Sequence, residues 1–166
     1  MKLVGLGLLL LAAIWLGQYK TARLRERATL LRQLRDFVNS VAQEIGYTAR
    51  PIDQIAARLQ GREAFRDCAV VASLAAGRIE AEGFAPPWEE ALRGAPALTP
   101  GDRELLEAFG RGLGRSDAAS QVAHCRRYAQ ELEEALALAQ RETAEKGRLY
   151  LSLSALGGAF VVIVLL

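Results

Sequence analysis

Hydrophobic and polar residues are distributed very unevenly along this chain. Runs without any charged side chain stand at both ends, whereas the centre alternates apolar and charged positions at helical spacing. All 19 Asp and Glu residues lie between Glu26 and Glu145, and every Lys or Arg except Lys2 lies between Lys20 and Arg148. This pattern excludes a simple soluble globule, and an apolar content of 51% excludes a disordered chain.

The charge-free ends predict membrane helices at residues 1–19 and 149–166. The first reads LVGLGLLLLAAIWLGQY after Lys2, and it is about 26 Å long as a helix, at the low end for crossing a bilayer. The last reads LYLSLSALGGAFVVIVLL. Two alternatives stay open for the first run: a cleaved signal peptide, although no clear cleavage site follows it, or a buried core helix.

Basic residues lie on the central side of both runs, at Lys20, Arg23, Arg25, Arg27, Arg141, Lys146 and Arg148. Because Lys and Arg stay on the cytoplasmic side of a membrane, this bias predicts a cytoplasmic domain at residues 20–148 with both termini outside. The first cluster could also attract anionic membrane lipid. Two cysteines suit a reducing compartment without a disulfide framework. A net charge of +2 is too small to indicate a nucleic-acid partner.

The centre is rich in Ala, Leu, Glu, Arg and Gln, which favours helices throughout. A first helix continues from the membrane to Gly46, with one apolar face formed by Leu24, Leu31, Leu34, Val38, Val41 and Ile45. A last helix begins after Ser116 or Asp117 and runs to Arg148, with its apolar face at Val122, Cys125, Ala129, Leu132, Leu136 and Ala139. Both helices enter the membrane from the same side, so we expect them to be antiparallel partners.

Four shorter helices are predicted between these two. One follows Pro51 and ends at Gly61, the next spans residues 62–81, and a short one contains Trp88 and ends at Gly94. The fourth begins at Thr99-Pro100, where Thr is a good N-cap and Pro fits the first helical position. We therefore expect an all-α fold, a six-helix bundle flanked by N- and C-terminal transmembrane helices.

No group of residues in the chain predicts catalysis, a cofactor or a metal. His124 and Cys125 are neighbours, but adjacent residues on a helix point about 100° apart, so core packing explains them better than a shared site. Glu89-Glu90 and the carboxylates of residues 131–134 fit solvated helix faces.

A glycine-rich basic segment is the candidate partner-binding turn. Its candidate residues are Phe109, Gly110, Arg111, Gly112, Gly114, Arg115, Ser116 and Asp117. It lacks the lysine and the spacing of a phosphate-binding loop, and it follows a helix rather than a strand. The plainer interpretation is a helix end capped by glycine, a tight turn and the cap of the next helix. We expect an exposed, thin backbone flanked by Arg111 and Arg115, which a partner could contact.

Several ordered motifs give the chain a resemblance to a known family. They are LRER at residues 24–27, LRQL at 31–34, EIGY at 44–47 before Pro51-Ile52, LTPGD at 98–102, FGRGLGRSD at 109–117 and GRLY at 147–150. The chain resembles the stage III sporulation protein AB family over essentially its whole length. It departs from that family at Arg50, where the family tends to have Thr, and residues 61–96 match only loosely.

The resemblance implies a role that the residues alone do not. The family is similar to the F platform protein of type II secretion systems, and it implies a helical cytoplasmic domain in the mother-cell membrane that faces the forespore. It implies as partners a cytoplasmic secretion-type ATPase and other stage III sporulation channel proteins, which this protein would position without being an enzyme. The alternative is a helical membrane sensor in which a ligand between helices acts on the two spans. Neither the sequence nor the resemblance fixes an oligomeric state, so a homo-oligomer stays open.

Overall fold

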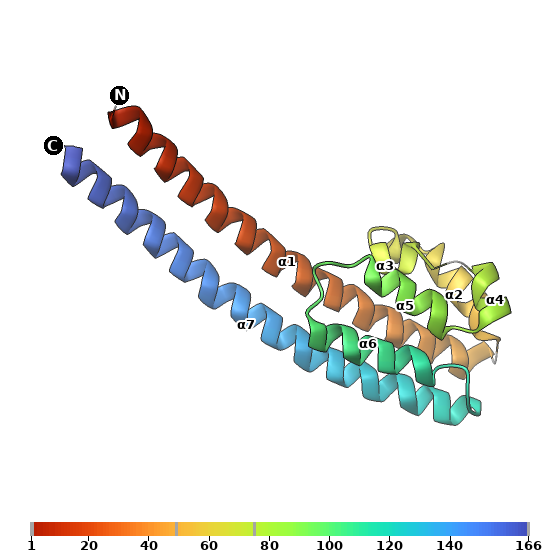
Figure 1. The fold of residues 1–166 in the computed structure, drawn as a ribbon. Coiled ribbons are helices and arrows are strands. Elements are labelled where there is room, and N and C mark those ends of the chain that lie inside the picture. Colours follow the sequence, from red (N-terminus) through yellow and green to blue (C-terminus); the bar gives the residue numbers. More distant parts are fainter. Residues whose placement is uncertain (1, 49, 75, 166) are drawn as a thin grey trace. The chain divides into compact units, whose positions relative to one another are not determined.

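The computed structural model describes the backbone of residues 2–48, 50–74 and 76–165, and the side chains of residues 22–48, 50–74, 77–146 and 149. All regular structure in these ranges is helical (Figure 1). The elements are α1 (Lys2–Thr48), α2 (Ile52–Gln60), the 3₁₀ helix η1 (Glu63–Phe65), α3 (Ala69–Ala72), α4 (Ala76–Glu82), α5 (Ala85–Arg93), α6 (Pro100–Gly112) and α7 (Ala118–Leu165). The all-α prediction is confirmed, whereas the count of six helices is not.

The described chain divides into two compact units. One comprises residues 29–136, and the other pairs residues 1–28 with residues 137–166. The predicted boundaries at residues 19 and 149 depend on where a membrane begins, and they stay a prediction. Both predicted spans fall on residues whose side chains lie outside the described ones, apart from Leu149. Within the part of the chain that the structure describes, no helix carries an apolar stretch long enough to cross a bilayer.

The two long helices are paired in each unit. In the 29–136 unit, the Arg35 guanidinium donates to the Glu133 carboxylate. In the other unit, Arg27 lies 3.1 Å from the Glu142 carboxylate. Within the 29–136 unit, a Cβ added at Gly46 would also lie 3.9 Å from Val122. Residue numbers therefore rise along α1 while those of their partners fall along α7, which confirms the predicted antiparallel pairing in this unit.

The core of the 29–136 unit is built on the apolar face predicted for α1. Leu31, Leu34, Val38, Val41 and Ile45 are all buried, and Cys125, Leu132 and Leu136 of α7 are buried as predicted. Because such side chains recur at helical spacing, one continuous apolar stripe of each helix is buried.

An aromatic cluster joins α1, α5 and α6 inside this core. The indole of Trp88 is fully buried and stacks on Phe37 and Phe84. The Phe109 ring packs edge-on against it, with 5.8 Å between the ring centroids. The indole N–H donates to the backbone carbonyl of Leu106 at 2.7 Å. The one polar atom of this ring therefore has a hydrogen-bond partner although the ring is buried.

The single helix predicted for residues 62–81 is wrong. This segment forms η1, α3 and α4 with turns between them. Phe65, Val70 and Leu74 are all buried, yet Phe65 and Leu74 would point in opposite directions on one straight helix. The chain must bend to bury them together. The side-chain amide of Gln60 donates to the backbone carbonyls of Ala72 and Leu74 and supports the interrupted backbone.

Helix starts follow the predicted chemistry more closely. Thr99 caps α6, with its hydroxyl accepting from the Asp102 N–H and the Asp102 carboxylate accepting from the Thr99 N–H. This reciprocal capping box satisfies two backbone donors. Pro86 and Pro87 lie in the first turn of α5, where a missing N–H costs little.

Replacing Gly110 by Ala is expected to destabilise the protein by about 1–3 kcal/mol, because it overpacks the core. The new methyl group would lie 2.3 Å from Cδ1 of the buried Trp88 ring. Guanidinium unfolding of the full-length protein, followed by circular dichroism, measures the change.

Gly101→Ala is the matched control on the same helix, because a methyl group there meets nothing within 4 Å. It should leave stability unchanged or raise it by up to about 1 kcal/mol. Equal unfolding midpoints for the two variants would contradict the proposed close approach of α5 and α6.

Candidate functional site

The turn between α6 and α7 is fixed by its own backbone and side chains. Gly114 adopts a φ of +82°, a backbone conformation that residues other than glycine rarely adopt. Buried Gln121 reaches into the turn from α7. Its side-chain oxygen accepts from the Gly114 N–H at 2.8 Å, and its amide donates to the Ser116 hydroxyl at 2.8 Å and to the Gly112 carbonyl at 3.4 Å. The turn is therefore held in one conformation.

Asp117 caps α7, one of the two caps that the sequence predicts. Its carboxylate accepts from the backbone N–H of Ser120 at 3.1 Å and from the Ser120 hydroxyl at 2.6 Å. The hydroxyl hydrogen bond, followed by the backbone one, lowers the pKa of Asp117 below its usual value. Asp117 therefore caps α7 in its charged form.

The predicted exposure of the glycine-rich segment is only partly correct. Phe109 and Gly110 are buried, and Gly112 is half-buried against the His124 ring. Gly110 and Gly112 lie inside α6, so they permit close packing rather than cap the helix. The exposed members of the segment are Arg111, Gly114, Arg115, Ser116 and Asp117.

His124 and Cys125 have the structural roles that core packing predicts. The His124 ring stacks on Phe109, contacts Tyr128, and its Nε2 is 2.9 Å from the Phe109 carbonyl, which accepts its hydrogen. Cys125 is fully buried, and burial raises the pKa of its thiol to about 12. Burial also raises the pKa of Cys68. A protonated, inaccessible thiol is a poor nucleophile.

The described residues contain no cluster of three or more side chains suited to hold a metal ion. A groove of about 680 Å³ lies beside the turn. Its apolar lining includes Ile52, Ala85 and Pro86, together with the buried residues Ile45, Phe84 and Leu113. We call this feature the groove.

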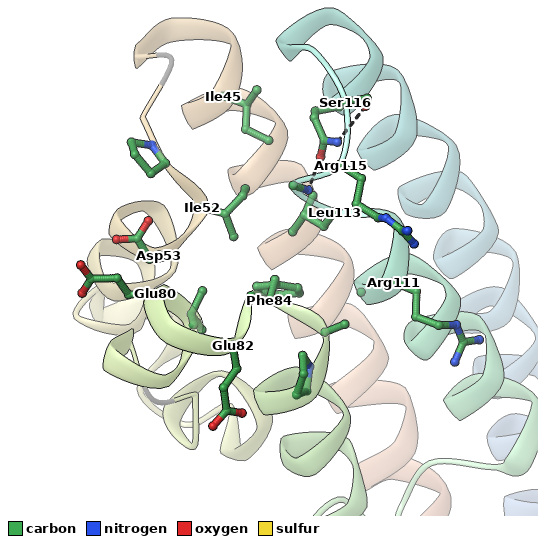
Figure 2. A pocket seen from close by; sticks show the side chains of 18 of the residues that line it. Ile45, Ile52, Asp53, Glu80, Glu82, Phe84, Arg111, Leu113, Arg115 and Ser116 are labelled. Atoms are coloured by element: carbon green, nitrogen blue, oxygen red, sulfur yellow. Dashed lines mark hydrogen bonds between the residues drawn. The ribbon is translucent and has the colours of Figure 1, made fainter.

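Two charged walls of opposite sign border the groove (Figure 2). The acidic wall consists of Asp53 on α2 and Glu80 and Glu82 on α4. The basic wall consists of Arg111 at the end of α6 and Arg115 in the turn, on the other side of Ile52 and Phe84. Arg50 also lines the groove, from the linker between α1 and α2.

Most of this wall charge is available to a partner. Arg111 is only loosely paired, with carboxylate oxygens of Glu89 and Glu107 at 3.5 and 3.7 Å. Glu82 pairs with exposed Arg78 at 3.5 Å. Among the residues that the structure describes, no ion pair is found for Arg115, Asp53 or Glu80.

The groove brings together motifs that are far apart in the sequence. Ile45, Pro51 and Ile52 come from the 44–52 region, and Gly110, Arg111, Gly114, Arg115 and Ser116 come from the candidate turn. The acidic wall was not predictable from the sequence. It forms because α4 packs beside α2, an arrangement that a continuous helix over residues 62–81 does not predict. The one available signal was Asp53 itself, an acid in the first turn after Pro51.

Comparisons with known proteins agree with this architecture. A model of the stage III sporulation protein AB family matches residues 2–166. The chain is 28% identical over 173 aligned positions to stage III sporulation protein AB of Bacillus subtilis (strain 168), covering 100% of this chain and 99% of that protein. A solved structure of stage III sporulation protein AB has a similar fold, with a TM-score of 0.57 at 22% identity over 72% of this chain and 97% of the solved chain.

The structure thus defines an all-helical protein whose distinctive surface is a groove between walls of opposite charge. The family match extends over nearly the full length rather than over one motif. The chain belongs to the stage III sporulation protein AB family.

Neither native cysteine is expected to react with a maleimide in the folded protein at mildly alkaline pH. Both thiols are buried, and their raised pKa values keep them protonated. Intact mass spectrometry after labelling of the full-length protein, before and after denaturation, checks this. Ser116→Cys, at an exposed position, should label fully as a control, whereas labelling of a native cysteine in the folded state would contradict the packing described for it.

Proposed function

We propose that this protein is a non-enzymatic, membrane-anchored platform in the sporulation channel complex between mother cell and forespore. In this role it positions a cytoplasmic secretion-type ATPase and the ring proteins of the channel. Membership of the stage III sporulation protein AB family supports the setting. The groove is the single observation that supports the mode of action, because it offers a shaped, charged surface for a protein partner.

The polar groups of the groove favour a protein partner over a small substrate. A small-molecule site needs polar groups that are buried and aimed at the ligand. Gln121 is the buried polar side chain of the lining, and the turn already uses both its amide group and its oxygen. Glu80, Glu82, Arg111 and Arg115 are exposed, as expected for the rim of a protein interface.

The ends of the chain support membrane anchoring in this proposal. Residues 1–19 and 149–166 carry no charge other than that of Lys2, and basic residues follow the first and precede the second. The backbone is helical throughout residues 2–48 and 118–165, so each apolar run continues a helix of the central region. We propose a two-pass protein of the mother-cell membrane facing the forespore, with the central region cytoplasmic and both termini outside.

Arg115→Glu is expected to weaken partner assembly about tenfold and to lower spore formation. Charge reversal removes one attraction at the groove and adds a repulsion, together worth about 1–2 kcal/mol. Co-purification of the ATPase with the full-length protein from membranes of sporulating cells, together with heat-resistant spore counts, measures the effect.

Arg126→Glu is the matched control, because Arg126 is exposed on α7 and does not line the groove. It should leave assembly and sporulation unchanged. If Arg115→Glu behaves like this control, the groove is not the docking site and the platform proposal loses its support.

The proposed topology predicts opposite labelling at two introduced cysteines. In intact cells, a membrane-impermeant maleimide should label Lys2→Cys and spare Ser116→Cys until the cells are permeabilised. The buried native cysteines provide a silent background. Labelling of Ser116→Cys in intact cells would place the central region outside, out of reach of a cytoplasmic ATPase.

A further inference from the structure

We infer that the groove binds one α-helix of a partner protein, and that this helix carries an apolar stripe with basic residues along one edge and acidic residues along the other. The inference rests on the proposed platform function and specifies the chemistry of the partner. It follows from the backbone chemistry, the volume and the charge of the groove.

Backbone chemistry favours a helix over an extended segment. An extended peptide needs partners for its own N–H and C=O groups, and a sheet edge is the usual source of them. The described residues contain no strand, and Ile52, Ala85 and Pro86 contribute apolar side chains to the lining of the groove. A helix satisfies its backbone internally and can pack against such an apolar lining without leaving backbone groups unpaired.

The volume of the groove is large enough for one partly sunken helix. A helix of about 5 Å radius fills about 420 Å³ per turn, since each turn rises about 5.4 Å. A groove of about 680 Å³ therefore accepts about three turns of a helix that is sunk to half its depth. Three turns are enough for apolar anchors at positions i, i+3 or i+4, and i+7.

The walls determine the charge of the two edges of the bound helix. The carboxylates of Asp53, Glu80 and Glu82 attract Lys or Arg on one edge, and Arg111 and Arg115 attract Asp or Glu on the other (Figure 2). Turning the helix end for end would place each edge against a wall of its own sign. Because like charges repel at both walls, the groove selects the direction of the helix as well as its sequence.

Synthetic peptides can test this charge pattern directly on the full-length protein in detergent. Each peptide has about 18 residues, long enough to form a helix, with the same leucine stripe. The segregated peptide carries Lys on one edge and Glu on the other. The mixed peptide has the same composition with both charges on both edges, and a third peptide carries Lys on both edges.

The wild-type protein should bind the segregated peptide about tenfold more tightly than the mixed one, by fluorescence anisotropy at low ionic strength. The double variant Arg111→Glu/Arg115→Glu should lose this preference and favour the peptide with two Lys edges, because both its walls are acidic. Glu80→Lys, which leaves the basic wall intact, should reduce the preference several-fold. Arg126→Glu should retain the wild-type preference.

Three outcomes would overturn the inference. The first is equal binding of the segregated and mixed peptides by the wild type. The second is a preference that survives in the Arg111→Glu/Arg115→Glu variant, whose folding circular dichroism verifies. The third is an oligomer, detected by analytical ultracentrifugation, that the same variant dissociates, because a second copy of this chain would then be the occupant.

The peptide assay separates this inference from the platform proposal. If Arg115→Glu abolishes ATPase assembly in cells but the peptides show no preference, the groove docks a partner of another shape and only the helix inference fails. If the peptides show the expected preference but Arg115→Glu leaves assembly intact, the platform proposal fails instead.

Discussion

The close approach of α5 to α6 at Gly110 is the constraint on which the groove depends. The Trp88 indole occupies the space that any Cβ at Gly110 would need. From that position it stacks on Phe37 of α1 and on Phe84, which lines the groove. Phe109, one residue before Gly110, stacks in turn on His124 of α7. A single missing side chain thus lets one aromatic cluster connect α1, α5, α6 and α7 under the groove.

A second constraint anchors the side of the domain that carries Asp53. Glu44 of α1 is only 8% exposed, and its carboxylate accepts from Arg62 at 2.6 Å and from Arg58 at 3.3 Å. A buried carboxylate without such partners would be strongly destabilising. The two arginines lie within and just beyond α2, so this ion pair holds α2, and with it Ile52 and Asp53, against α1.

Sequence patterns sufficed where one local interaction decides the structure. The stripe of α1, the Thr99–Asp102 capping box and the Asp117 cap each depend on residues close in sequence, and each was predictable. The segment 62–81 was not, because its bends serve to bury Phe65 and Leu74 together, which is a tertiary requirement. Composition also cannot distinguish a glycine that caps a helix from one whose missing side chain lets an aromatic ring pack against the helix. Gly110 and Gly112 lie in α6 against the rings of Trp88 and His124, whereas Gly114 has the positive φ of a turn glycine.

The rigidity of the turn affects how the groove can bind a partner. A flexible charged loop would lose conformational freedom on binding, and that loss would offset much of its electrostatic attraction. Here Gln121, the φ of Gly114 and the Asp117 cap fix the backbone that carries Arg115 before any partner arrives. Arg111 projects from the last turn of α6, a helix held by its capping box and by Trp88. The backbone of the basic wall is therefore ordered in advance, which lowers the entropic cost of binding through its charge.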